Sequence, residues 1–366
     1  MSTPPAAARL IRRLRIALVA LAMLVGVCAI AVLAVLWYWN GYLLQPDTSS
    51  PFTRGPFVAD VSGSSALVRW QGAPARDVQV VAVAPDGTTA VARDGAFSGL
   101  AAGTRYAWTA SVRGVPAAAG SFETAPTSPD APVTFGVIGD YGSGSAHEYA
   151  VGRGLAAIAP AFTVTAGDNS YLLALPQLLD RNIFRPLLPA MQQGPLVVDL
   201  GDHDTFGTGG RYLLDAVGMP GAALRYTWRY GPVRVLVLGV ESDPAAVAYA
   251  RSALAQPWRG VTFAVVHKPL QPGDPLSLAL KGRVTAVFSG HLHRHERRVV
   301  DGTTMITTGT GGEGAGAAEF TKRSADAAFS TTDYGFARVQ VGARDVRIDF
   351  VDEAGRVLDS TTVPRR

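Results

Sequence analysis

Five apolar, β-prone segments of the chain each lead directly into a side chain that can bind a metal ion. In four of them a glycine stands just before that side chain, which lets the backbone turn sharply and approach another segment closely. Two further donors, Tyr171 and His293, lie a few residues beyond two of these side chains. The segments and their side chains are 133–138 with Asp140, 162–166 with Asp168, 196–200 with Asp202, 262–266 with His267, and 284–289 with His291.

The position and the chemistry of these side chains favour a metal centre. In open α/β sheets ligands bind beyond the carboxyl ends of the strands, so five such ends would converge on one cleft. Carboxylates and imidazoles without thiolate suit Fe, Mn or Zn, and Mg less well. The donors are too many for one four-coordinate site, which favours two cations. Two metal ions about 3.5–4 Å apart can activate a water molecule and hold the attacking and leaving oxygens of a displacement at phosphorus. We therefore predict hydrolysis of a phosphate ester.

Single residues of this set also have structural interpretations. Asp140 and Asp168 stand in sequences that commonly form turns. A tyrosine that follows a strand, such as Tyr171, is often a packing residue. The ordered set, rather than any one residue, therefore carries the prediction. Three residues fit surface or supporting positions better than metal-ligand positions: His147, His295 and Glu313.

The five blocks resemble, in their order, the signature of the calcineurin-like metallophosphoesterases. The pattern Gly-Asp-x-x-Tyr at 167–171 is similar to the purple acid phosphatase branch of that superfamily. Residues 290–297 resemble the block Gly-His-x-His-x-Tyr-Glu-Arg of that branch, with His295 in the place of its tyrosine. Two later stretches, 309–312 and 334–336, resemble further core segments of the branch. The resemblance covers about residues 132–360.

The resemblance implies a four-layer α/β/β/α metallophosphoesterase domain with an acid phosphatase-like activity. The substrate class is not carried over from the family, and we expect phosphate monoesters first and diesters second. It implies one ferric ion and one divalent ion (Fe, Mn or Zn), with Asp168 bridging the two. It places His203 at the phosphate or the leaving oxygen, and Asp204 as the group that fixes the tautomer of that histidine. The implied ligands of the ferric ion are Asp140, Asp168, Tyr171 and His293, and those of the divalent ion are Asp168, Asp202, His267 and His291.

Two departures from the family pattern concern the second metal and the substrate. Asp202 stands where the family has asparagine, so a neutral ligand becomes an anion. The added charge should bind the second metal more tightly and make it a weaker Lewis acid. The family's further phosphate-facing histidines are missing from 270–280. The competing interpretation is a non-catalytic protein of this fold that binds a phosphoryl ligand or serves in adhesion. The physiological substrate and the oligomeric state are left open.

The segments around the five blocks alternate between strand and helix, as an α/β domain over 132–360 requires. Residues 146–158 and 245–254 are stretches that fit helices. Just before this domain, 124–132 contains three prolines and marks a domain boundary.

Ahead of that boundary, residues 55–126 are predicted to form a small β-sandwich, because short β-prone runs alternate with Gly, Pro and Asp clusters. The pattern Gly99-Leu100…Gly103-Thr104-x-Tyr106, with Trp70 upstream, resembles fibronectin type III. A spacer or docking module is the expected role. The predicted strands are 57–61, 65–70, 78–83 and 106–112.

Residues 16–39 form a run of 24 residues without a charge. As a helix this run reaches roughly 36 Å, against a hydrocarbon core of about 30 Å. Basic residues before it and aromatic residues after it predict a single-pass membrane anchor, with 1–15 cytoplasmic, 40–54 a linker and the domains outside the cytoplasm. The alternative is an export signal that is cleaved. The basic residues are Arg9, Arg12, Arg13 and Arg15, and the aromatic residues are Trp37, Tyr38, Trp39 and Tyr42.

The composition excludes several other classes of protein. Of the 366 residues 48% are hydrophobic and 17% are charged, which fits globular domains and not a disordered chain. The net charge of +4 comes from the four N-terminal arginines, since without them 29 basic residues face 29 acidic ones. The neutral remainder gives no reason to expect nucleic-acid binding. Cys28 is the single cysteine, so an intrachain disulfide and a cysteine-rich zinc site are excluded.

Overall fold

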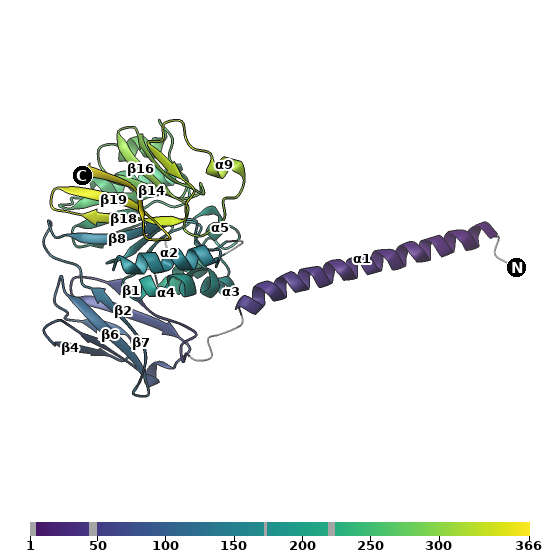
Figure 1. Ribbon diagram of the computed structural model, residues 1–366, viewed down its shortest axis with the longest axis horizontal. Coiled ribbons are helices and arrows are strands. Elements are labelled where there is room, and N and C mark those ends of the chain that lie inside the picture. The colour runs from purple at the N-terminus through teal and green to yellow at the C-terminus, as the bar shows by residue number, and fades with distance from the viewer. Residues whose placement is uncertain (1–4, 44–49, 172–173, 219–223) are drawn as a thin grey trace. The chain divides into compact units, whose positions relative to one another are not determined.

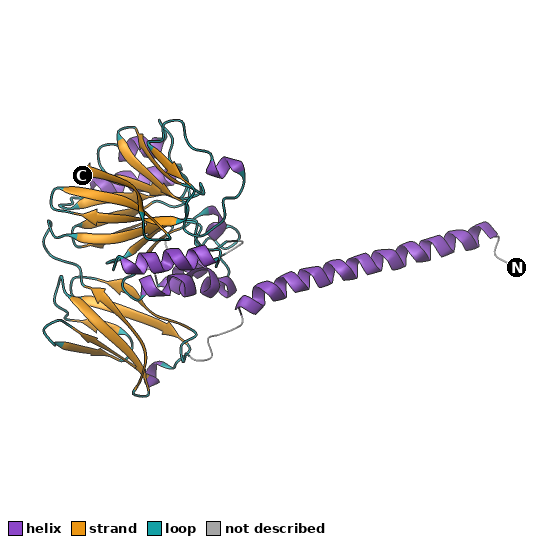
Figure 2. Cartoon of the chain, in the orientation of Figure 1, coloured by secondary structure: helices purple, strands orange, loops and turns teal. Residues whose placement is uncertain are grey.

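The computed structural model describes residues 5–43, 50–171, 174–218 and 224–366. The chain divides into two units, Met1–Thr48 and Ser49–Arg366, and each is described by itself. The first unit is the helix α1 (Pro5–Leu43), which Figure 2 shows as one continuous coil.

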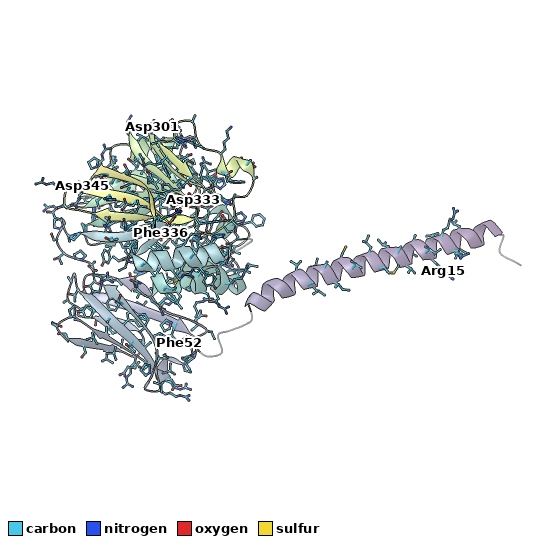
Figure 3. The ribbon with its side chains drawn as sticks, in the orientation of Figure 1. Arg15, Phe52, Asp301, Asp333, Phe336 and Asp345 are labelled. Atoms are coloured by element: carbon cyan, nitrogen blue, oxygen red, sulfur yellow. The ribbon has the colours of Figure 1, made fainter. Side chains whose placement is uncertain are left out.

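Helix α1 carries one stretch, Leu10–Val35, that is long and apolar enough to cross a membrane. Its mean hydropathy is 3.0, and none of its best window is buried, so its side chains project freely (Figure 3). A signal sequence at this place would have the same character. The side chains of Arg9, Trp37, Tyr38, Trp39 and Tyr42, and residues 44–49 of the expected linker, lie outside the described residues.

Seven strands at the start of the second unit form a β-sandwich (Figure 1). One antiparallel sheet has the order β1-β2-β5 and the other β4-β3-β6-β7. Phe122 of the second sheet is buried and lies 6.0 Å from Phe97 of the first. The Tyr106 hydroxyl accepts a hydrogen bond from the Ala101 amide at 2.9 Å, a corner contact of the kind that immunoglobulin-like sandwiches use. The strands are β1 (Arg54–Val61), β2 (Ser65–Gln71), β3 (Val78–Val83), β4 (Thr89–Ala92), β5 (Ala96–Ser98), β6 (Arg105–Val112) and β7 (Val115–Glu123), with the short helix η1 (Ala75–Asp77) before β3.

Two mixed sheets form the rest of the second unit. The first has the order β10-β9-β8-β18-β19-β20, and the second the order β11-β12-β13-β14-β16-β15-β17. Strands β8, β9 and β10 run parallel, as do β12, β13, β14 and β16. The first sheet consists of β8 (Val133–Ile138), β9 (Thr163–Ala166), β10 (Leu196–Asp199), β18 (Gly335–Val341), β19 (Asp345–Asp352) and β20 (Val357–Pro364). The second consists of β11 (Tyr226–Tyr230), β12 (Val233–Val237), β13 (Val261–Val265), β14 (Ala286–Ser289), β15 (His295–Val300), β16 (Thr303–Thr308) and β17 (Phe329–Thr331).

The two sheets face each other and helices cover their outer faces, so the four-layer α/β/β/α prediction is confirmed. Phe135 of the first sheet stacks at 4.6 Å on Phe162, the residue before β9, and meets Phe263 of the second sheet at 5.3 Å. Helices α2 and α4 share an apolar cluster with the first sheet, and α7 and α8 share one with the second. The described helices are α2 (Ala146–Ala157), α3 (Pro176–Leu179), η2 (Asp180–Phe184), α4 (Arg185–Met191), α5 (Asp202–Thr205), α6 (Arg211–Val217), α7 (Pro244–Ala255), α8 (Pro275–Leu280) and α9 (Ala318–Thr321).

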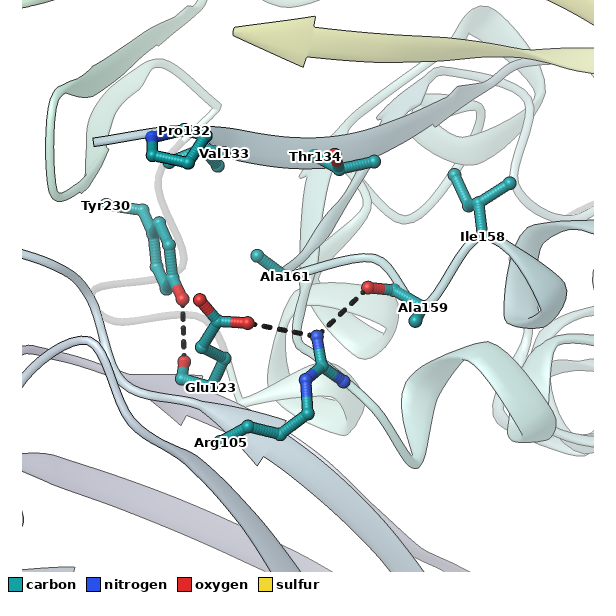
Figure 4. A pocket seen from close by; sticks show the side chains of 9 residues that line it. All are labelled: Arg105, Glu123, Pro132, Val133, Thr134, Ile158, Ala159, Ala161 and Tyr230. Atoms are coloured by element: carbon teal, nitrogen blue, oxygen red, sulfur yellow. Dashed lines mark hydrogen bonds and ion pairs between the residues drawn. The ribbon is translucent and has the colours of Figure 1, made fainter. Parts of the chain in front are cut away.

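The β-sandwich packs against the α/β part instead of hanging from it as a free spacer. The carbonyl of Gln192, just after α4, accepts hydrogen bonds from the Trp108 indole at 3.2 Å and from the Ser121 amide at 3.0 Å. A cavity of about 220 Å³ lies at the same boundary (Figure 4). At its wall the Tyr230 hydroxyl donates to the Glu123 carbonyl at 2.7 Å, and Arg105 pairs with the Glu123 carboxylate at 3.0 Å.

Candidate metal centre

The five strand ends expected to carry metal ligands meet at one edge of the two sheets. Strands β8, β9 and β10 neighbour one another in the first sheet, and β13 and β14 neighbour one another in the second. Because all five run the same way within their sheets, the residues that follow them gather at their carboxyl ends. Contacts between the two sets join the sheets: the His291 amide donates to both carboxylate oxygens of Asp140, at 3.0 and 2.8 Å.

Three of the expected ligands hold an unusual backbone conformation. Asp140, Asp168 and His291 have φ angles of 53°, 50° and 66°, in the left-handed region that side-chain-bearing residues seldom adopt. Each follows a glycine at the end of a strand. Such conformations persist only where the surrounding structure fixes them, and they cluster at functional sites. The backbone turns sharply at each of these strand ends, and the three side chains contact other donors of the cluster.

Two of the preceding glycines make room for a ligand. A Cβ atom on Gly290 would collide with the carboxylate of Asp140, and one on Gly201 would collide with the carboxylate of Asp168. Any larger residue at these positions would therefore displace an aspartate. The expected role of glycine in these blocks has this concrete steric basis.

A first group of donors consists of Asp202, His267 and His291, whose ligand atoms lie within 4.8 Å of one another. Oδ1 of Asp202 is 2.9 Å from Nε2 of His267 and 3.4 Å from Nδ1 of His291. This group is the open side of the centre, because the side chain of Asp202 is 46% exposed and that of His291 is 26% exposed.

A second, buried group consists of Asp140, Asp168 and His267, so His267 belongs to both. Nε2 of His267 is 3.4 Å from Oδ1 of Asp168. Tyr171 and His293 adjoin this group. The Tyr171 hydroxyl lies 3.1 Å from both Oδ1 of Asp140 and Nε2 of His293. The structure thus brings all seven expected ligands into one cluster.

Hydrogen bonds to backbone carbonyls orient two of the imidazoles. Nδ1 of His267 lies 2.8 Å from the Ala166 carbonyl, and Nδ1 of His293 lies 2.6 Å from the Gly314 carbonyl. A carbonyl can only accept, so each Nδ1 carries the proton and each Nε2 is left to bind a metal. Metal-binding histidines are commonly held by a second hydrogen bond of this kind.

The cluster is rich in carboxyl groups whose pKa values are shifted by burial and by the neighbouring histidines. Burial raises the pKa of Asp140 to about 8. Burial opposes a charge on His267, but the carboxylates of Asp168 and Asp202 outweigh it and raise the pKa of that histidine well above its usual range. Hydrogen bonds from His267 and His291 lower the pKa of Asp202. Every described ion pair of these three carboxylates is with a histidine. The proton favoured on His267 balances part of the charge that a metal cation would otherwise balance.

These observations fit a dinuclear metal site. The donor set of carboxylates, imidazoles and a phenol suits iron, manganese or zinc. Burial and the neighbouring Asp140 raise the pKa of Tyr171 well above its usual range, so a phenolate here would need a strongly charged cation beside it. Asp168 lies against donors of both groups, as a bridging ligand must.

His203 and Asp204 occupy the turn of α5 next to this cluster. The His203 amide donates to Oδ1 of Asp168 at 3.1 Å, and its ring lies 4.7 Å from that of Tyr171. The expected hydrogen bond between the His203 imidazole and the Asp204 carboxylate is not among the described contacts. The buried carboxylate of Asp204 instead accepts from the amides of Asn169, Ser170 and Gly201 and from the Asn169 side chain. A carboxylate in the first turn of a helix readily accepts hydrogen bonds from free backbone amides. Two of the amides here belong to a segment distant in sequence, so no local pattern predicts the contact.

Two histidines lie outside the cluster, as expected, and one aromatic residue beside it was not predicted. His147 is exposed, pairs with Glu353 at 2.8 Å and stacks on Tyr334. His295 is buried in β15 and stacks on Phe350 at 4.0 Å. No sequence pattern pointed to Phe320 of α9, whose ring stacks on that of His293 at 5.3 Å.

Similarity to known proteins is found in the structure and not in the sequence. No protein-family model and no curated protein matches this sequence. Purple acid phosphatase PPD1 from yellow lupin seeds is similar in fold, with a TM-score of 0.65 at 15% identity over 86% of this chain and 75% of that one. PhoD gives a TM-score of 0.58 at 15% identity over 86% and 94% of the two chains. GAP50, the anchor in the inner membrane complex of Plasmodium, gives 0.53 at 15% identity over 64% and 89%. At such identities the likeness shows the fold.

Proposed function

We propose that this chain, which has the calcineurin-like metallophosphoesterase fold in its purple acid phosphatase-like form, is a membrane-anchored phosphoesterase acting outside the cytoplasm. Phosphate monoesters are the first substrate class and diesters the second. One observation carries the proposal: seven metal-capable side chains from distant strand ends meet in a single cluster with two imidazole Nε2 atoms turned inward. Such a cluster suits hydrolysis at phosphorus.

The proposed ligands divide between the buried and the open side of the cluster. A ferric ion would be held by the buried side and a divalent ion (Fe, Mn or Zn) by the open side, with Asp168 shared. Bound there, the two ions would supply Lewis acidity toward the phosphoryl oxygens and an activated water. The buried set is Asp140, Asp168, Tyr171 and His293, and the open set is Asp168, Asp202, His267 and His291.

His203 is the proposed proton donor to the leaving oxygen. Its backbone is tied to Asp168, and its ring lies beside Tyr171 at the mouth of the cluster. In the reaction water adds to phosphorus, the bond from phosphorus to the leaving oxygen breaks, the proton of His203 passes to that oxygen, and the protons of the water stay with the released phosphate. Asp204 contributes by fixing the backbone of residues 169–170 and 201, between which Asp168 is held.

A binding protein on this fold is the second candidate. Asp202 adds a negative charge that lowers the Lewis acidity of the second metal, and the solved neighbour GAP50 is described as an anchor. In this alternative the same cluster binds metal and a phosphoryl ligand without turnover.

The decisive experiment measures metal content and turnover on one preparation of the full-length protein in detergent. Release of p-nitrophenol from p-nitrophenyl phosphate and from the bis-ester is followed across pH 4–8 after loading with Fe, Mn or Zn. We expect turnover that falls by at least 10³-fold in Asp168→Asn and in His291→Ala. His147→Ala, which removes an exposed histidine outside the cluster, is the matched control. Two bound metals per chain without turnover under any condition would favour the binding protein.

The anchor is tested separately. The intact mass of the membrane-extracted protein should include residues 1–43, and alkaline carbonate should not release it. A mature chain that begins beyond residue 39 would show a cleaved export signal instead.

A further inference from the structure

Phe206 is the most exposed large apolar side chain among the described residues of the second unit. It is 72% exposed, against 66% for Val115 and 63% for Val299. Single exposed apolar residues are common on protein surfaces. Phe206 differs from the other exposed apolar residues because it follows Asp202, a residue of the open side of the metal cluster, by one helical turn.

Backbone hydrogen bonds place Phe206 one helical turn from Asp202. The Phe206 amide donates to the Asp202 carbonyl at 3.1 Å, and the Thr205 amide donates to the Gly201 carbonyl at 3.1 Å. Residues four apart in such a turn lie on the same face, with Cβ atoms about 5–6 Å apart. Asp202 directs its carboxylate to His267 and His291, so Phe206 stands at the rim on that same side.

The turn that carries Phe206 is held in place. The Gly209 amide donates to the Thr205 carbonyl at 2.9 Å, and the Thr208 hydroxyl donates to the Asp204 carbonyl at 3.1 Å. Asp204 is itself buried and fixed to Asn169. The phenyl ring is therefore presented to solvent by a fixed backbone.

Two further rings, those of Tyr171 and His203, lie beside the metal cluster near Phe206. The rings of Tyr171 and His203 lie 4.7 Å apart, and His203 is three residues before Phe206. A leaving group that departs past His203 would pass the exposed ring of Phe206.

We propose that Phe206 determines specificity by stacking on a planar, aromatic leaving group of the phosphate ester, such as an aryl group or a nucleobase. This inference rests on the proposed phosphoesterase function. Stacking of a base on an aromatic side chain is worth about 1–3 kcal/mol, which corresponds to a change of roughly fivefold to a hundredfold in affinity. Leucine at the same position would keep the apolar volume and lose the planar face.

A matched pair of substrates separates the effect of an aromatic leaving group from that of its apolar volume. Benzyl phosphate and cyclohexylmethyl phosphate have leaving groups of similar size and reactivity, and only the first is aromatic. AMP and ribose 5-phosphate form a second pair that separates a nucleobase from a small aryl group. We measure kcat/KM of the metal-loaded full-length protein for all four, in wild type, Phe206→Ala, Phe206→Leu, Phe206→Tyr and the control Val299→Ala.

The aromatic preference, written as the ratio of kcat/KM within a pair, should fall about tenfold in Phe206→Ala and Phe206→Leu in at least one pair. It should persist in Phe206→Tyr and in the Val299→Ala control. An equal loss for both members of each pair, or no loss, would overturn the inference while leaving the phosphoesterase function intact.

Binding provides a readout that does not need turnover. Benzylphosphonate should bind the metal-loaded wild type about tenfold more tightly than cyclohexylmethylphosphonate, and Phe206→Ala should abolish that difference. If both phosphonates bind equally well in wild type, Phe206 does not select planar groups, whether or not the protein is an enzyme.

Discussion

The Tyr171 hydroxyl lies 3.1 Å from Nε2 of His293, although the two residues are 122 positions apart in the chain. Both face Asp140 from the same side, with the hydroxyl 3.1 Å and Nε2 3.5 Å from its Oδ1. A phenol, an imidazole and a carboxylate thus converge on a volume the size of one ion. This convergence gives the sharpest spectroscopic test of the centre.

If Tyr171 binds a ferric ion, the iron-loaded protein should be coloured. A phenolate bound to ferric iron gives a charge-transfer band in the visible region, and Tyr171→Phe should abolish that band while iron is retained by the other ligands. The measurement is an absorption spectrum alongside elemental analysis. His147→Ala should keep the colour, since that residue is exposed and paired with Glu353. A colourless wild-type protein with full iron content would contradict phenolate ligation.

Without metal, the protein should become less stable as the pH rises from 5 to 9. The pKa of Asp140 in the folded chain is about 8 because of burial, above its ordinary value of 3.8, so the folded state keeps a proton that the unfolded chain has lost. Its stabilising contribution is full below the unfolded pKa and is lost as the pH rises through the folded one. The raised pKa of His267 acts in the same direction. Urea titrations of chelator-treated protein should show the decline.

Asp140→Asn should reduce that pH dependence, because the amide does not titrate, while the contribution of His267 remains. Saturating metal should reduce it as well, since a cation replaces the protons and favours the ionised carboxylate. Stability that rises from pH 5 to pH 9 in the chelator-treated wild type would contradict the assignment of a protonated Asp140.

Asp202→Asn should loosen the second metal and raise its reactivity. The substitution removes one negative charge from an oxygen ligand while keeping its size, so divalent metal affinity should fall by about tenfold or more. At saturating metal, kcat should rise because the less neutralised cation is the stronger Lewis acid. Metal titration by calorimetry and steady-state kinetics measure the two effects. Unchanged affinity would show that Asp202 does not contact the metal.

Gly290→Ala should disrupt the centre through steric overlap. The added methyl group would meet the carboxylate of Asp140, so metal binding should weaken and the free energy of unfolding should fall by roughly 1–3 kcal/mol. Gly314→Ala is the matched control, because a Cβ at that position has no atom within 4 Å. Similar metal content and stability in both variants would show that Gly290 is not sterically required.

The convergence of the five donor blocks was predictable because each block is local. An apolar strand followed by glycine and a donor is visible within ten residues, and the order of such blocks implies a common edge of the sheet. Helices α2 and α7 also lie within a residue or two of the predicted ranges. In the β-sandwich, β1, β2, β3 and β6 were visible as β-prone runs. Strands β4, β5 and β7 were not, because their sequences are short or rich in Ala and Gly and gain their order from the neighbouring strands.

What escaped prediction depends on partners distant in sequence. Asp204 could bond either to the histidine beside it or to the amides of residues 169–170, and only the fold shows the second. The stacking of Phe320 on His293 and the docking of Trp108 on Gln192 are likewise made between segments that no local pattern connects. Such contacts follow from tertiary packing, which overrides local preference.

The place of β8 in its sheet has a consequence for biosynthesis. This strand, which leads into Asp140, lies between β9 and β18, and β18 begins only at Gly335. As the polypeptide leaves the ribosome, β8 can pair with β9 early, but its other edge waits until nearly the whole chain has been made. Pairing across such a long separation is slow because a large loop must close first. If the cluster binds metal ions as proposed, they should therefore enter late, after translation, and nascent or C-terminally shortened chains should fail to retain them.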